Sequence, residues 1–300
     1  MRALLLNCLL TLAPMVCMAE KVALTFDDLP LNGTLQAGVS EADIVKRVLP
    51  IFAARRTPPI YGFINARKLE GNPAGAEALQ LWMAAGHKLG NHTYSHMDLS
   101  TNPFEAFSRD IIQNEPALLL LSPREDWRWL RYPYLHEGEA LDKRNAVRTF
   151  LDERGYRIAQ VTLDWEDYMW NSAYARCAAK GDKSSIEWLH RSYLDTAAGF
   201  LDGQREMAQA LYGRKIDHVM LLHLGAFSPE ILPALFDLLQ QKGFELGTLD
   251  AVQRDAAYRT NPEFLHTNTG TLLEQQYDKT KKKYPALPKK PRKELEEICK

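Results

Sequence analysis

Short apolar segments rich in β-formers alternate with longer segments of helical pattern along most of the chain. A repeated strand–helix–strand order implies a parallel sheet or barrel wrapped by helices. We therefore predict an α/β fold, a distorted (β/α)7 barrel. The expected strands are Val22–Thr25, Ile60–Ile64, Lys88–Asn91, Trp129–Tyr132, Arg157–Leu163, His218–His223 and Phe244–Gly247. The expected helices are Glu41–Arg55, Ala74–Ala85, Pro103–Leu121, Glu139–Arg154, Lys183–Leu211, with a division at Gly199 and Gly203, and Pro229–Gln241.

The length and the composition are those of an ordinary soluble enzyme. A chain of 300 residues suffices for one large α/β domain or two small ones. Hydrophobic residues make up 46%, and the net charge of −1 gives no indication of a nucleic-acid partner. We expect one domain over 20–275, followed by a tail over 276–300 that is rich in lysine and proline.

The N-terminus has the pattern of a secretory signal peptide. Arg2 precedes an apolar run, and Ala19 stands at a plausible cleavage position. The alternative, a membrane anchor, is disfavoured because the run is short and Asn7 and Pro14 interrupt it. We expect residues 1–19 to be cleaved and the protein to be exported to the periplasm or secreted. No later segment of the sequence has the pattern of a membrane span.

Two features of the exported chain stay open. Cleavage would leave Cys177 and Cys299, which either pair in an oxidising compartment or remain free thiols. A bridge would tie the tail to the domain. The lysine- and proline-rich run 279–293 is typical of a solvated, extended arm, and the alternative is an arm that docks on an anionic polymer.

Polar side chains gather just after the expected strands. In parallel α/β folds, the carboxyl ends of the strands form one edge, where sites are built. That edge should collect acids, imidazoles and an arginine. The residues are Asp27, Asp28, His92, Arg131, Tyr134, Asp164 and His223.

His92 and His96 are candidate metal ligands. On a helical turn, residues four apart share a face, so both imidazoles can reach one ion. Two histidines and a carboxylate are a common ligand set for Zn²⁺ and similar ions. Asp27 and Asp28 supply carboxylates at a strand end, where one can bind the ion and the other can act on a water molecule. The alternative for the two aspartates is a solvated loop pair.

Five motifs occur in one order along the chain: L-T-F-D-D from Leu24, H-T-Y-S-H from His92, R-Y-P-Y from Arg131, D-W-E-D-Y from Asp164 and L-L-H from Leu221. Together they resemble the motifs of the NodB-homology polysaccharide deacetylases, carbohydrate esterase family 4. The matches run from Thr25 to His223.

The resemblance implies a role for each matched position. A divalent metal, most simply Zn²⁺ with Co²⁺ or Ni²⁺ as substitutes, would bind Asp28, His92 and His96. The other implied roles are a general base at Asp27 held by Arg131, an oxyanion donor at the backbone N–H of Tyr134, a general acid at His223 oriented by Asp167, and an acetyl-methyl pocket lined by Leu221 with Tyr168 or Trp165.

The sequence departs from the family pattern in three places. Leu29-Pro30 stands where many relatives have Gly-Pro, and Leu135 follows Tyr134 where a glycine is usual. The fourth motif has two registers: either Asp167-Tyr168 or Asp164-Trp165 takes the place of the Asp-Trp pair. The partner of His223 is therefore open between Asp167 and Asp164.

The resemblance implies an exported, metal-dependent hydrolase that removes N-acetyl groups from amino sugars of a polysaccharide or oligosaccharide, with water activated by the metal as the nucleophile. One alternative is an esterase for O-acetyl groups, such as those of xylan, or a hydrolase of another C–N bond. A second alternative is a glycan-binding relative without activity, against which the complete set of motif residues argues. The sequence predicts neither the particular glycan nor the oligomeric state.

Overall fold

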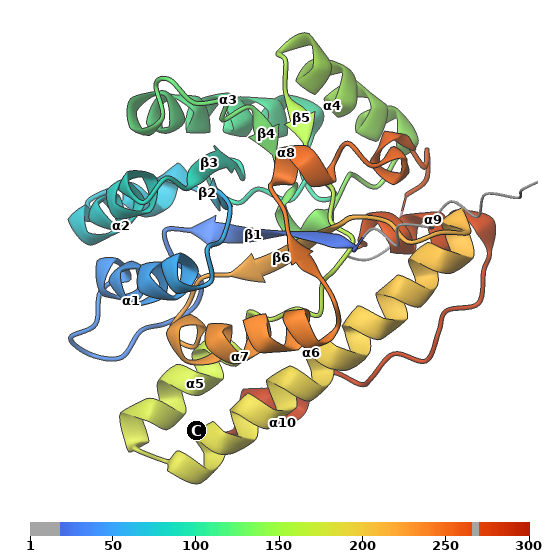
Figure 1. Cartoon of the computed structure of the whole chain (residues 1–300). Coiled ribbons are helices and arrows are strands. Elements are labelled where there is room, and N and C mark those ends of the chain that lie inside the picture. The colour runs from blue at the N-terminus through green and yellow to red at the C-terminus, as the bar shows by residue number, and fades with distance from the viewer. Residues whose placement is uncertain (1–18, 266–269) are drawn as a thin grey trace, which may run out of the picture.

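The computed structural model describes residues 19–265 and 270–300, so nearly all of the expected signal peptide lies outside the described part. Seven parallel strands form one sheet in the order β5-β4-β3-β2-β1-β6, with β7 paired to β1. The strands are β1 (Lys21–Leu29), β2 (Tyr61–Ile64), β3 (Lys88–Asn91), β4 (Trp129–Leu130), β5 (Arg157–Ile158), β6 (His218–His223) and β7 (Glu245–Leu246). The predicted parallel barrel wrapped by helices is confirmed (Figure 1).

The stretch 157–163 closes the sheet into a ring. Its first residues pair with β4, where Ala159 N donates to Leu130 O at 2.8 Å. Its last residues pair with β6, where Leu221 N donates to Leu163 O at 3.0 Å. We predicted one strand over this stretch, whereas the structure has a two-residue strand and an isolated bridge because the chain crosses between two partners.

Strand β1 separates an outer core from the barrel interior. Successive side chains of a strand point to opposite faces. Phe26 points outward and packs against Phe52 and Trp82, with ring centroids 5.8 Å away in both cases. Thr25 and Asp27 lie on the opposite face, where both accept hydrogen bonds from Arg131. The strand therefore stabilises the fold with one face and supplies polar groups to the barrel mouth with the other.

Ten α-helices lie in the described residues. They are α1 (Glu41–Ala54), α2 (Pro73–Ala84), α3 (Phe104–Leu121), α4 (Leu141–Glu153), α5 (Met169–Lys180), α6 (Lys183–Tyr212), α7 (Ser228–Gln241), α8 (Leu249–Val252), α9 (Leu272–Thr280) and α10 (Arg292–Glu297). The expected division within 183–211 is wrong, because α6 continues through both of its glycines. None of the helices in the described ranges is long and apolar enough to cross a membrane.

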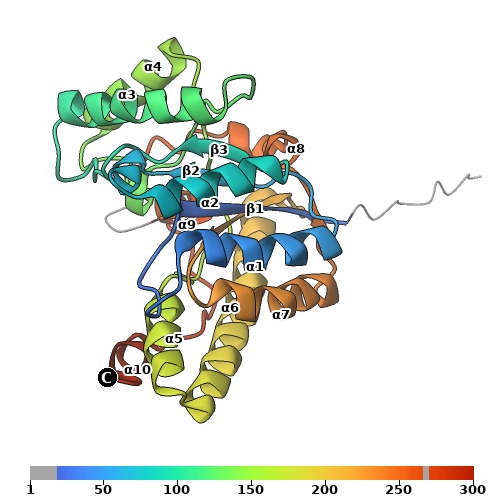
Figure 2. The same cartoon turned by 90° about the vertical axis from the view of Figure 1, so that its left-hand side faces the viewer.

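The C-terminal segment is docked on the domain and is not the solvated arm that we expected. Helix α9 crosses the predicted domain boundary at 275/276. Beyond it the chain runs beside α6 to α10, which contacts α5 (Figure 2). Cys177 of α5 and Cys299 form a disulfide, which settles the alternative that the sequence left open.

Candidate active site

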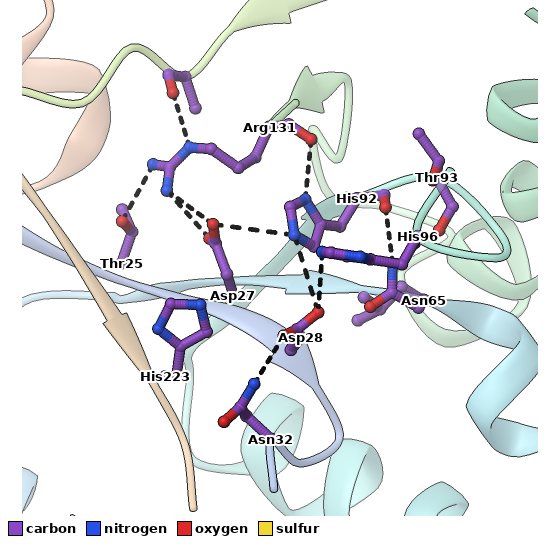
Figure 3. A network of polar contacts seen from close by, with 12 residues as sticks. Thr25, Asp27, Asp28, Asn32, Asn65, His92, Thr93, His96, Arg131 and His223 are labelled. Atoms are coloured by element: carbon purple, nitrogen blue, oxygen red, sulfur yellow. Dashed lines mark hydrogen bonds and ion pairs between the residues drawn. The ribbon is translucent and has the colours of Figure 1, made fainter. Parts of the chain in front are cut away.

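Asp28, His92 and His96 come together at the carboxyl end of the sheet (Figure 3). One potential ligand atom from each residue lies within 4.8 Å of the other two. Asp28 Oδ1 is 3.8 Å from His92 Nε2 and 3.4 Å from His96 Nε2. This oxygen is buried and has no hydrogen-bond partner among the described residues. A buried carboxylate oxygen that faces two imidazole nitrogens is a suitable donor set for a divalent cation.

The ring of His92 is held in the orientation that a metal ligand needs. Its Nδ1 lies 2.8 Å from the carbonyl oxygen of Arg131. A carbonyl only accepts, so Nδ1 carries the proton and Nε2 presents a lone pair toward Asp28. Burial lowers the pKa of His92 to about 4, which keeps the imidazole neutral.

The two histidines lie in a loop after β3 and not on a helical turn. Thr93 and His96 both have positive φ, of 58° and 60°, and the imidazole rings are 4.9 Å apart. Asp110 of α3 holds the loop by accepting hydrogen bonds from the backbone N–H and the hydroxyl of Ser95. The common face that a helix would give is produced instead by left-handed backbone turns.

Asp28, the penultimate residue of β1, is in the left-handed conformation, with φ of 65°. Asn32 donates to its Oδ2 at 2.8 Å, and Lys68 Nζ lies 3.4 Å from its Oδ1. Burial raises the pKa of Asp28, but the charge of Lys68 and the neighbouring imidazoles outweigh burial, and the net pKa lies below the usual range. The carboxylate is therefore ionised and able to bind a cation.

Arg131 holds the neighbouring carboxylate of Asp27. Its Nη1 lies 2.9 Å and 3.1 Å from the two oxygens of Asp27. Its remaining nitrogens donate to Thr25 Oγ1 and to Ala159 O, so the guanidinium itself is fixed. Burial raises the pKa of Asp27, although the positive charge of Arg131 opposes that rise. A buried carboxylate with a raised pKa is suited to accept a proton.

His223 pairs with Asp167 and not with Asp164. His223 Nδ1 is 2.7 Å from Asp167 Oδ1, and its backbone N–H donates to Asp167 Oδ2 at 2.9 Å. Burial lowers the pKa of His223, but Asp167 and the other acids outweigh it and raise the pKa to about 9. The structure thus has the register in which Asp167-Tyr168 takes the place of the Asp-Trp pair. His223 is held as a protonated group near neutral pH.

The expected wall residues divide into two groups. Tyr168 and Leu221 line the cavity, and the Tyr168 ring lies 5.3 Å from His223. Tyr134 borders the cavity with its ring 4.5 Å from His96. Trp165 is fully buried against Tyr193 and does not line the cavity, which corrects our expectation for it. Asp164 and Glu166, on either side of Trp165, both line the cavity, and the indole between them points into the core.

The cavity has a volume of about 380 Å³ and receives side chains from several loops. Sequence reasoning missed Asn32 and Glu166, which line it, and Lys68, which binds Asp28. None of the three belongs to a predicted ligand or acid–base pair, so no sequence pattern singled them out. Asp164 lines the cavity too, and burial raises its pKa to about 6.

The site is built from strained backbone. Of the ten described non-glycine residues with positive φ, five line the cavity: Asp28, His96, Tyr134, Leu135 and Glu166. Such conformations cost on the order of 1–3 kcal/mol each and persist where the surroundings fix them. The departure from the family pattern at Leu135 falls on one of these positions.

Residues 18–159 match the model of the polysaccharide deacetylase family, the family that the motifs resemble. The chain is 26% identical over 147 residues to a chitin deacetylase of Arthroderma benhamiae, covering 49% of this chain and 35% of the relative. It is 28% identical over 116 residues to a chitooligosaccharide deacetylase of Sinorhizobium fredii, covering 39% of this chain and 47% of the relative. The matches therefore span less than half the length of these curated relatives.

The fold is similar to that of a solved chitin deacetylase from Colletotrichum lindemuthianum. The TM-score is 0.53 at 21% identity, and the match covers 84% of this chain and 95% of the other. At this identity the similarity concerns the fold alone. The family match and the similar fold both agree with the parallel barrel described above.

Proposed function

We propose that this protein is a metal-dependent hydrolase that removes N-acetyl groups from amino-sugar units of a polysaccharide or oligosaccharide. The observation that carries the proposal is the convergence of three groups on one cavity. These are the cluster of Asp28, His92 and His96, the Asp27–Arg131 pair and the His223–Asp167 pair. The names of the curated relatives, both deacetylases of N-acetylated sugars, support the same class of substrate.

The donor set fits a divalent cation, because Asp28 Oδ1, which accepts no hydrogen bond from the described residues, faces Nε2 of both histidines. We propose Zn²⁺ as the native ion, with Co²⁺ or Ni²⁺ able to replace it. When bound, such an ion supplies a Lewis acid for the acyl carbonyl and lowers the pKa of water.

The side chains around this cluster account for the proton transfers of amide hydrolysis. Asp27, oriented by Arg131, accepts a proton from the attacking water. His223, kept protonated by Asp167, donates a proton to the amine nitrogen as the C–N bond breaks. The amine leaves poorly without that proton, so the acid is needed for an amide. Leu221 offers an apolar wall for the acetyl methyl group.

Acetate release tests the function. The purified protein would be incubated with N-acetylated chitooligosaccharides and with O-acetylated xylan, with and without a chelator, and then with Zn²⁺ restored. We expect acetate from the N-acetylated sugars, its loss with chelator and its return with metal. Release from xylan alone would favour the O-acetyl esterase. Binding of glycans without any release from metal-loaded protein would favour a non-catalytic protein.

The place of action is also a proposal. The N-terminal pattern supports export, and a disulfide between Cys177 and Cys299 suits an oxidising compartment. Cell fractionation of the expressed full-length chain, with N-terminal sequencing of the mature protein, tests this point. A mature N-terminus at Glu20 is expected, and retention of Met1 in the cytosolic fraction would contradict export.

A further inference from the structure

Glu166 occupies an unusual position next to the proposed general acid. It lies in the loop between Asp164, which lines the cavity, and Asp167, which holds His223. Its backbone is left-handed, with φ of 62°, although it is not a glycine. Such a conformation persists where surrounding contacts fix it. Within the loop, the Glu166 backbone N–H donates to Asp164 Oδ1 at 2.8 Å.

The C-terminal segment provides contacts from outside the loop. Lys290 Nζ lies 2.8 Å from Glu166 Oε1, and Arg292 forms an ion pair with the other oxygen. The Glu166 side chain is only 14% exposed, so the two cations balance a mostly desolvated carboxylate. Lys290 also lies over the ring of Phe200, 4.9 Å from its centroid.

Two glycines of α6 let the segment approach closely enough. A Cβ atom on Gly199 would lie 2.8 Å from Pro288 Cγ, and one on Gly203 would lie 2.3 Å from Leu287 Cδ2. The glycines are four positions apart and therefore share a face of the helix. Leu287 and Pro288 pack against this glycine face of the helix. Their packing brings Lys290 and Arg292 next to Glu166.

The far end of the segment is fastened to α5. Cys299 is bridged to Cys177, and Arg176 donates hydrogen bonds to the carbonyl oxygens of Leu295 and Ile298. Leu295 is 3% exposed. The segment is thus anchored on both sides of the two cations. Figure 1 shows its course in red from α9 to α10.

We propose that Lys290 and Arg292 are positioning residues for the proposed acid, because they fix Glu166 and thereby the loop from which Asp167 orients His223. The inference rests on the proposed function, since it assigns His223 the protonation of the leaving amine. The C-terminal segment then contributes to the function of the site, although it lies outside residues 18–159, which match the family model.

A pair of substrates separates positioning from general damage. An amide needs protonation of the leaving nitrogen, whereas 4-nitrophenyl acetate releases a stable phenolate without an acid. Loss of the acid's orientation therefore lowers kcat for an N-acetylated chitooligosaccharide and spares the aryl ester. General acid catalysis contributes about 100-fold or more, so we expect at least a tenfold fall in kcat for the amide. The KM should change less than kcat.

Two variants of the full-length, metal-loaded protein remove the contact by different routes. The double variant Lys290→Gln/Arg292→Gln removes the charges, and Gly199→Ala/Gly203→Ala displaces the segment while favouring the helix. The matched control is Lys289→Gln/Lys293→Gln, which removes two exposed cations that have no ion pair with the described residues. The exchange Lys290→Arg/Arg292→Lys should restore amide hydrolysis.

An independent measurement is the exchange rate of the His223 Nδ1 proton, followed by ¹H NMR. A selective loss of amide hydrolysis, with faster exchange of this proton, supports the inference. Equal loss on both substrates, or no loss in either variant, overturns it. If the wild type releases no acetate from N-acetylated sugars, the proposed function is wrong. In that case the positioning role is still tested by the exchange of the His223 Nδ1 proton, and an unchanged exchange rate in the variants overturns it.

Discussion

Asp27 and His223 are register partners on the neighbouring parallel strands β1 and β6. The pairing places the proposed base and acid side by side at the carboxyl end of the sheet, and each is oriented by a separate partner. Arg131 binds Asp27, and Asp167 binds His223. The two proton-transfer groups are therefore fixed by the backbone register and need no loop movement to meet.

Replacing Asp27 with asparagine should stop turnover without loss of metal. The amide cannot accept the proton of water, so we expect acetate release to fall by about 100- to 10,000-fold. Metal content, measured on the purified variant, should equal that of the wild type. Asp142→Asn, at an exposed position on α4, is the control and should change neither value. Full activity in Asp27→Asn would show that another group is the base.

His223→Ala should discriminate between leaving groups. The variant should lose hydrolysis of N-acetylated chitooligosaccharides by at least about 100-fold and keep most of its activity on 4-nitrophenyl acetate. Asp167→Asn should show the same selectivity, because it removes the charged partner of the imidazole. A parallel loss on both substrates in either variant would argue against His223 as the acid.

His92→Ala and His96→Ala should each lose metal affinity, measured by calorimetric titration with Zn²⁺. Removing a residue that hydrogen-bonds to a metal ligand lowers metal affinity about 10–100-fold, and removing the ligand itself should lower it further. His190→Ala is the control because His190 packs against Phe227 and is not one of the three residues of the cluster. Wild-type affinity in both ligand variants would place the ion elsewhere.

Lowering the pH should destabilise the protein, in part because it protonates Glu137. This buried carboxylate binds Arg144 and Arg148. Burial raises its pKa, but the two arginines outweigh burial and lower it below the ordinary value of 4.5. A folded pKa below the unfolded one means that the stabilisation is present above about pH 4.5 and is lost as the pH falls through the folded pKa.

Urea unfolding of the wild type and of Glu137→Gln measures this contribution. The variant should be less stable at pH 7, and the difference should shrink as the pH falls below 4.5. A difference that is constant with pH would assign the effect to packing alone. Glu153→Gln, at an exposed position at the end of α4 that has no ion pair with the described residues, should leave the pH dependence unchanged.

Phe26→Ala should destabilise the outer core. The ring packs against Phe52 and Trp82, and its loss leaves a cavity between β1 and two helices. We expect a loss of about 3–5 kcal/mol in the free energy of unfolding. Leu120→Ala, at a side chain that is 83% exposed, should change it by less than about 0.5 kcal/mol. Equal effects in both variants would contradict the described core.

Local sequence patterns predicted the strands and helices that bury one regular apolar face. The strands Lys88–Asn91 and His218–His223 have the predicted bounds. In the second strand, four apolar residues lie between two histidines, which mark its ends. Helix α6 continues through Gly199 and Gly203 because those glycines face the docked C-terminal segment. Helices α5 and α10 were missed, since their contact with each other and their tether are tertiary.

The motifs identified the ligand cluster, the Asp27–Arg131 pair and His223, because these residues lie at or shortly after the ends of strands. They left the partner of His223 open between Asp167 and Asp164. They could not identify Lys68 or Glu166. Lys68 lies on the short helix Ala66–Leu69, and its role depends on reaching across to Asp28. Glu166 depends on cations more than a hundred positions further along the chain. Such long-range charge pairs leave no signal in local spacing.

The left-handed backbone around the cavity has a consequence for engineering. Exchanging Tyr134 or Leu135 for glycine, where φ is 60° and 56°, relieves steric strain and so favours a more heat-resistant protein. The same exchange removes a side chain that lines the cavity and allows the backbone there to adopt other conformations. Selection for thermal stability alone should therefore enrich variants that stay folded on heating but have lost turnover.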